Sequence, residues 1–184
     1  MIFTPLSLAG AYIVEPTVHA DERGLFYRYF SADEFQKIGH HKPWVHLNHS
    51  YTKTRGSIRG LHFQQPPHSE IKMVKCIAGK ILDVIIDLRK DSQSFLQWTG
   101  IEISAENRRM LYIPEGFAHG FQTLTDDCEL IYHHSNVYVK ESEGGIRWDD
   151  PSLNIRWPLP GVNISERDQQ HPLITQHFPG IKLS

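Results

Sequence analysis

Short strand-like segments with alternating side chains dominate the middle of this sequence. In KILDVIIDL (80–88), Leu82, Val84 and Ile86 fall on one face of an extended chain. Turn-forming sequences separate this segment from four more of the same kind, which cover 97–104, 109–114, 120–125 and 128–138. Strands this short and closely spaced favour an all-β barrel or sandwich over a sheet built from βαβ units.

Helical signal is confined to one short segment near the N-terminus. In SADEFQKIG (31–39), Ser31 is the expected N-cap and Gly39 the expected stop. The chain has 184 residues, which fits one domain with a sizeable core. We expect N-terminal strands and the short helix in 1–50 and the barrel core in 51–140. A C-terminal extension, 141–184, should pack on the barrel to bury its apolar side chains Trp148, Ile155 and Trp157.

The composition is that of an ordinary globular protein and excludes several functional classes. Hydrophobic residues make up 40% and charged residues 22%, with a formal net charge of −2. Nothing in this balance indicates binding to nucleic acid or to an anionic membrane. The N-terminus lacks the basic region of a signal peptide, and no apolar run approaches the roughly 20 residues that span a bilayer. A cytoplasmic protein is expected, with Cys76 and Cys128 as reduced core thiols.

A lysine in RGLHFQQPPHSEIKMVKC (59–76) points toward the expected core. Lys72 shares strand parity with Val74 and Cys76, so its ammonium lies where apolar side chains lie. Burying an ammonium without a partner is costly, and lysines are rarely buried unpaired. Lys72 is therefore a candidate for stabilising negative charge that develops beside a cavity.

Three further side chains could take part in proton transfer or ligand binding. His62 lies near Arg59, but the two have opposite parity, so a bulge at Gly60 is needed to bring both to one site. Tyr132 shares a face with apolar residues and is either a core tyrosine or a general acid. The turn in IPEGFAHGF (113–121) leads His119 into the next strand.

A metal site is a competing interpretation of the same region. Four side chains have suitable ligand atoms: His62, His68, Glu70 and His119. Metal-binding barrels of the cupin kind usually supply an H-x-H pair, and the residue two positions after His62 is Gln64. The sequence therefore favours a site without a metal ion.

Several motifs, in order, resemble the dTDP-4-dehydrorhamnose 3,5-epimerase family of nucleotide-sugar enzymes. They are DERGLF, RGLHFQ, KMVKCIAGKILDVIIDLR, IEISAENRRMLYIPEGFAHGF, GIRWDDPSLNIRWP and ISERD, and they extend from about residue 20 to 172. The resemblance implies a cupin-type jelly-roll barrel that forms a homodimer and needs no metal or organic cofactor. It also implies conversion of dTDP-4-dehydro-6-deoxy-D-glucose to dTDP-4-dehydro-L-rhamnose through an enolate.

The resemblance also implies roles for individual residues. His62 would be the base, paired with Asp168, while Lys72 stabilises the enolate and Tyr132 returns a proton on the opposite face. The remaining matched positions would bind the substrate, with Arg23 at the nucleotide phosphates and Phe26 beside it. The others are Asn48, Arg59, His119, Tyr138, Glu143 and Arg167.

Two positions depart from the family pattern. Arg28 stands where the family often has Glu, and His46 stands where it often has Gln. Both positions belong to ligand recognition, so the departures leave the nucleotide and the sugar open. The sequence as a whole also leaves open an epimerase acting only at C3 or only at C5 of a related dTDP- or CDP-linked sugar. A metal-dependent cupin enzyme and a sugar-binding cupin without catalysis are the more distant alternatives.

Overall fold

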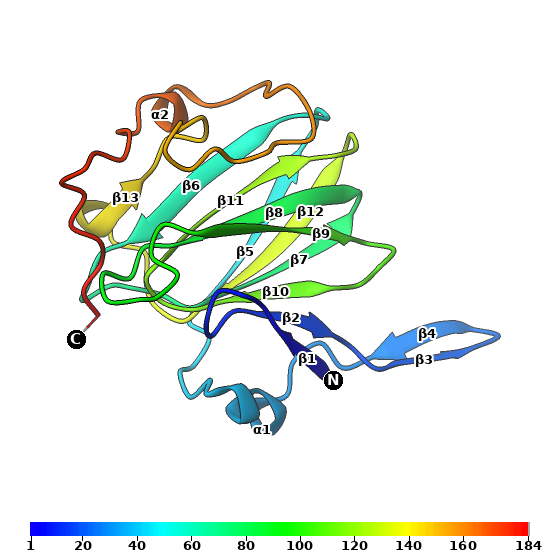
Figure 1. Ribbon diagram of the computed structural model, residues 1–184. Coiled ribbons are helices and arrows are strands. Elements are labelled where there is room, and N and C mark those ends of the chain that lie inside the picture. The colour runs from blue at the N-terminus through cyan, green and yellow to red at the C-terminus, as the bar shows by residue number, and fades with distance from the viewer. Residues whose placement is uncertain (184) are drawn as a thin grey trace.

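Two antiparallel sheets face each other in the computed structural model, which describes residues 1–183 (Figure 1). Ser184, the last residue of the predicted extension, lies outside the described residues. The six-stranded sheet has the order β1-β2-β10-β7-β12-β5. Its strands are β1 (Ile2–Pro5), β2 (Tyr12–Glu15), β5 (His46–Thr52), β7 (Lys72–Ala78), β10 (Met110–Ile113) and β12 (Cys128–His134).

The second sheet has five strands in the order β13-β6-β11-β8-β9. These are β6 (Ile58–Gln64), β8 (Lys80–Asp87), β9 (Trp98–Ser104), β11 (Phe117–Thr123) and β13 (Glu143–Gly145). A separate hairpin, β3 (Val18–Asp21) and β4 (Gly24–Tyr27), projects beyond the sheets (Figure 1). The helical elements are α1 (Ala32–Phe35), α2 (Glu166–Gln169) and the 3₁₀ turns Gln36–Ile38 and Lys140–Ser142. The all-β prediction is confirmed.

Strand β8 is buried on both faces, which explains its two apolar rows. Ile81 and Ile85 belong to the cluster that also contains Val74 and Leu130 of the facing sheet. Residues of the opposite parity, such as Val84, pack in a second cluster. The extension covers that outer face, where Ile155 and Trp157 pack as predicted, and Trp148 is partly buried.

Some predicted strand boundaries were wrong, because a strand extends only as far as the neighbouring strand with which it pairs. The strand predicted over 128–138 ends at His134, since its partner β5 begins at His46, directly opposite. The strand predicted to start at residue 120 starts at Phe117, opposite Asp87. Ser31 occupies the N-cap position of α1, but its hydroxyl bonds to the side chain of Asp33 and caps no backbone N–H.

Other local predictions agree with the structure. Gly39 ends the short helical segment in the left-handed conformation, at φ 81°. Cys76 and Cys128 are free, buried thiols. Burial raises the pKa of Cys76 to about 12, so this thiol is protonated and unreactive at neutral pH. Among the described residues, no helix is long and apolar enough to cross a membrane.

Candidate functional site

A cavity of about 770 Å³ is lined by strands of both sheets and by the segment around α2. Strands β6 and β11 contribute from the five-stranded sheet, and β5, β7 and β12 from the six-stranded sheet. Eight of the predicted site residues line it: Asn48, Arg59, His62, Lys72, His119, Tyr132, Arg167 and Asp168.

The predicted irregularity at Gly60 is present and brings Arg59 and His62 to one cavity. His62 lies opposite His119, whereas Arg59 lies opposite Phe121, so the register shifts between these pairs. Gly60 has a φ of 117°, and a Cβ atom there would lie 2.6 Å from the Cα of Gly120. Only glycine fits this close approach of the two backbones.

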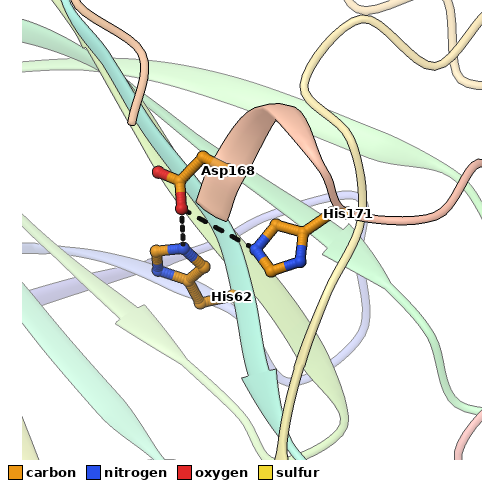
Figure 2. A group of neighbouring side chains, drawn as sticks. All are labelled: His62, Asp168 and His171. Atoms are coloured by element: carbon orange, nitrogen blue, oxygen red, sulfur yellow. Dashed lines mark hydrogen bonds and ion pairs between the residues drawn. The ribbon is translucent and has the colours of Figure 1, made fainter. Parts of the chain in front are cut away.

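His62 and Asp168 form the predicted dyad (Figure 2). The Nε2 atom of His62 lies 2.8 Å from Oδ1 of Asp168, and the backbone N–H of Gly60 donates to Oδ2 at 3.0 Å. Burial opposes ionisation of Asp168, but hydrogen bonds from His62 and Gly60 hold its pKa well below the usual range. An ionised Asp168 accepts the Nε2–H proton of His62, which leaves Nδ1 with the free lone pair of a base.

The helix that carries Asp168 is held by a side-chain cap. The hydroxyl of Ser165 accepts a hydrogen bond from the backbone N–H of Asp168 at 3.1 Å. This contact fixes the first turn of α2, so the buried carboxylate of Asp168 stays directed at β6.

A second histidine–aspartate pair lies beside the same cavity, which His119 lines. His119 Nε2 is 2.6 Å from Oδ1 of Asp83, and both residues are buried. Sequence reasoning missed Asp83 as a site residue. The available signal was its parity: Asp83 shares a face of β8 with Ile81 and Ile85, and a carboxylate there needs a buried partner.

Lys72 is buried as predicted, and its partner is Glu70. The ammonium lies 3.3 Å from Glu70 and 3.4 Å from the carbonyl oxygen of His62. His134 Nδ1 contacts the other carboxylate oxygen of Glu70 at 2.8 Å. Burial opposes ionisation of Glu70, but His134 and Lys72 keep the pKa of this carboxyl below its usual value. Glu70 is therefore the counter-ion that offsets the free-energy cost of burying the Lys72 ammonium.

Tyr132 enters the cavity from the sheet that also carries Lys72. Its hydroxyl lies 3.2 Å from the hydroxyl of Ser50 on the neighbouring strand β5. Burial raises the pKa of Tyr132 well above the usual value, so the phenol keeps its proton at neutral pH. His62 and His119 come from the other sheet, so imidazoles and phenol flank the cavity from different sheets.

Three predicted substrate-binding residues form a chain at the rim. Tyr138 donates to Glu143 at 3.0 Å, and Glu143 pairs with Arg167 at 3.1 Å. The other end nitrogen of Arg167 lies 3.1 Å from Nε2 of His62. Arg167 therefore connects the rim to the dyad, while Tyr138 and Glu143 lie outside the cavity lining.

The remaining predicted site residues lie away from this cavity. Arg23 and Phe26 belong to the projecting β3–β4 hairpin, where Arg23 pairs with Asp21 at 2.6 Å (Figure 1). Arg28 follows the hairpin and lines a small depression with Phe26. His46 begins β5, opposite His134.

The side chains weighed as metal ligands do not form one cluster. His62, His119 and Glu70 each bond to a different partner. Over residues 1–183, the histidine, cysteine and acidic side chains with converging ligand atoms are His62, Asp168 and His171, within 4.8 Å of one another. Sequence reasoning missed His171, which stands three residues after Asp168.

Comparison with known proteins identifies related sequences along most of the chain. The family model described as dTDP-4-dehydrorhamnose 3,5-epimerase matches residues 5–176. A protein of that name from Salmonella typhimurium is 42% identical over 178 residues, or 96% of this chain and 97% of the relative. One from Methanothermobacter thermautotrophicus is 46% identical over 170 residues, which is 91% of each chain.

A solved structure has the same fold. It is a dTDP-6-deoxy-D-glucose-3,5-epimerase from Legionella pneumophila, in complex with dTDP-4-keto-L-rhamnose. The two sequences are 34% identical, and the superposition has a TM-score of 0.92. It covers 100% of this chain and 98% of the Legionella chain. The match confirms the predicted cupin-type barrel.

Proposed function

The chain belongs to the dTDP-4-dehydrorhamnose 3,5-epimerase family, and we propose that the cavity between its two sheets is where the epimerisation takes place. The protein is accordingly an isomerase. The observation that supports this site most strongly is the placement of acid and base groups. A histidine–aspartate dyad comes from one side, and an ammonium and a phenol come from the facing sheet.

The first step is removal of a proton next to the sugar's C4 carbonyl. Nδ1 of His62 is the acceptor, because Nε2 already donates to Asp168. A neutral imidazole, with an ordinary pKa of about 6.5, is a suitable base at neutral pH. Asp168 holds the tautomer and stabilises the imidazolium that forms, as a buried carboxylate does in other dyads.

The negative charge then moves to the C4 oxygen, which becomes an enolate. Lys72 is the group that stabilises it, because its ammonium is already desolvated in the cavity and anchored by Glu70. His119, whose ring is held by Asp83 at 2.6 Å, lines the same cavity and is positioned to contact the sugar.

Inversion requires a proton to arrive on the face opposite His62. Tyr132 supplies it, because this phenol belongs to the facing sheet and burial keeps it protonated. Ser50, 3.2 Å away, positions the phenol oxygen. Once His62 has released its proton to solvent and Tyr132 has regained one from solvent, the same pair of groups can act at the second carbon.

Anchoring of the nucleotide falls to residues around the opening. Guanidinium groups bind phosphates through two parallel hydrogen bonds, and Arg59 and Arg167 line the cavity. Asn48 lines the cavity from β5, and Tyr138 is exposed at the rim, where an aromatic ring can stack on the base. Arg28 and His46 are the positions at which nucleotide and sugar selectivity can differ from relatives.

Proton NMR in heavy water tests this function directly. Incubation of the 184-residue protein with dTDP-4-keto-6-deoxyglucose should incorporate deuterium at C3 and C5 and form dTDP-4-dehydro-L-rhamnose. Full activity is expected in EDTA, since the proposed steps use only side chains. Exchange confined to one carbon would identify a single-carbon epimerase, and absence of exchange would contradict catalysis at this cavity.

We also propose that the protein forms a homodimer in which the β3–β4 hairpin completes the partner's site. Arg23 and Phe26 match nucleotide-binding positions, yet the hairpin carries them away from the cavity of their own chain. Phe26 is 69% exposed and Leu25 is 48% exposed on β4, so this projecting hairpin presents apolar surface that a partner chain can cover. The edge strand β5, beside the cavity, exposes Leu47 and Tyr51.

Mixed dimers provide the test. Arg23→Ala and His62→Ala chains, co-expressed with different tags, should each have little activity at low substrate concentration as homodimers. A hybrid contains one pocket with His62 and a wild-type hairpin from its partner. Random 1:1 pairing should therefore restore about a quarter of wild-type activity. If Arg23 serves its own chain's cavity, mixing restores nothing.

A further inference from the structure

A histidine outside the proposed reaction lies beside the catalytic dyad. His171 Nε2 is 3.7 Å from Oδ1 of Asp168, the same oxygen that His62 contacts at 2.8 Å. Figure 2 shows the two imidazoles approaching that carboxylate oxygen from different sides. The Nε2 atom of His171 is buried and has no hydrogen-bond partner. A polar atom in this condition normally has a ligand or a water molecule to bind.

The surroundings hold all three side chains in place. A Cβ atom at Gly145 would lie 2.2 Å from the His171 ring, so the ring lies directly against this glycine. Asp168 is fixed through Oδ2 by the Gly60 N–H at 3.0 Å. His62 is held by its strand and by Asp168. The ligand atoms of these residues lie within 4.8 Å of one another, so little rearrangement is needed to converge on one ion.

We propose that His62, Asp168 and His171 form a site for a zinc-type transition-metal ion, and that occupation of this site inhibits the enzyme. Two imidazole nitrogens and one carboxylate oxygen suit Zn²⁺, with bonds of about 2.0–2.2 Å, and suit Mg²⁺ or Ca²⁺ poorly. The ion would lie between the two Nε2 atoms and Oδ1 of Asp168. A fourth position would remain open to water.

Inhibition follows from the tautomer of His62. In the metal-free dyad, Nε2 carries the proton and Nδ1 has the free lone pair. An ion bound through the Nε2 lone pair takes the place of that proton, and the one N–H of the neutral ring then lies on Nδ1. The proton relocates through solvent, with no net release. His62 can then accept no proton from the sugar, although the substrate pocket is unobstructed. This inhibitory effect rests on the proposed function, whereas metal binding itself does not.

One neighbour opposes the ion. The Arg167 guanidinium lies 3.1 Å from Nε2 of His62 and 3.4 Å from Oδ1 of Asp168, and its charge repels a dication. Its side chain is 55% exposed and already pairs with Glu143, so it can turn outward when the ion binds. We expect Arg167→Gln to bind the ion more tightly.

Metal titration of the 184-residue protein, freed of metal with EDTA and then dialysed, tests the site. Zn²⁺ should lower the epimerisation rate at saturating substrate, excess substrate should not restore the rate, and EDTA should. Co²⁺ should produce visible absorption bands as it binds to the imidazoles. In His171→Ala, the loss of one ligand should weaken binding of both ions by roughly 100-fold or more. Each variant's inhibition is compared with its own metal-free rate.

Controls separate this site from other histidines and from loss of folding. His177→Ala, an exposed histidine six residues further along, should retain wild-type metal affinity. His171→Gln provides a second variant if His171→Ala melts early. Equal inhibition of wild type and both His171 variants would overturn the proposal, and so would activation by Zn²⁺. Metal-free exchange at C3 and C5 is measured separately, so failure of the epimerase function would be distinguished from failure of the metal site.

Discussion

Replacing His62 with alanine is expected to lower the epimerisation rate by roughly 10²–10⁴-fold, the usual contribution of a positioned general base. The variant should also lose deuterium uptake at both C3 and C5, because His62 is the proposed proton acceptor at both carbons and alanine offers no lone pair in its place. The measurement is NMR of the substrate incubated with the variant in heavy water.

The matched control for this change is His177→Ala, which removes an exposed imidazole and should leave both rates near wild type. Asp168→Asn should leave His62 in place but weaken its preference for the Nε2–H tautomer, giving a loss smaller than that of His62→Ala. Wild-type exchange in His62→Ala would show that another group removes the proton.

Tyr132→Phe is expected to separate exchange from inversion. The variant retains His62, which can remove a proton and return it on the same face, so some deuterium should still enter the substrate. Epimerised product should fall by roughly 10²-fold or more, because the proton donor of the other sheet is missing. Product formation and exchange are measured on the same NMR sample.

The control at a comparable position is Tyr12→Phe, a partly buried tyrosine that packs on Tyr112 outside the cavity. It should leave product formation and exchange unchanged. Equal and complete loss of both signals in Tyr132→Phe would contradict the division of labour between the two sheets. It would instead indicate that the phenol is needed before the proton is removed.

Much of the fold could be predicted because burial leaves a regular trace in the sequence. Alternation in 80–88 identified strand β8, and the inward parity of Lys72 pointed to a charged group in a cavity. Burial of both faces of β8 was found only in the structure. Strand ends were less predictable. The last residue of β12 depends on where β5 begins, and those segments lie about 80 residues apart.

The candidate site was predictable only in part, for the same reason. His62, Lys72 and Tyr132 carry local signals, namely parity and residue type. The link from His62 to Asp168 spans 106 residues, and that from His119 to Asp83 spans 36. Asp83 and His171 were missed, because their partners are defined by proximity in the fold.

By itself, the sequence determined the strand periodicity, the inward lysine and the glycine that lets Arg59 and His62 share a cavity. All of these depend on neighbours a few residues away, where backbone geometry dictates which way side chains point. Only the tertiary structure decided which charges are paired, which nitrogen of His62 is free and which histidine lies beside the dyad. Those properties depend on distances of about 3 Å between atoms from distant segments, and such distances exist only after the two sheets have packed.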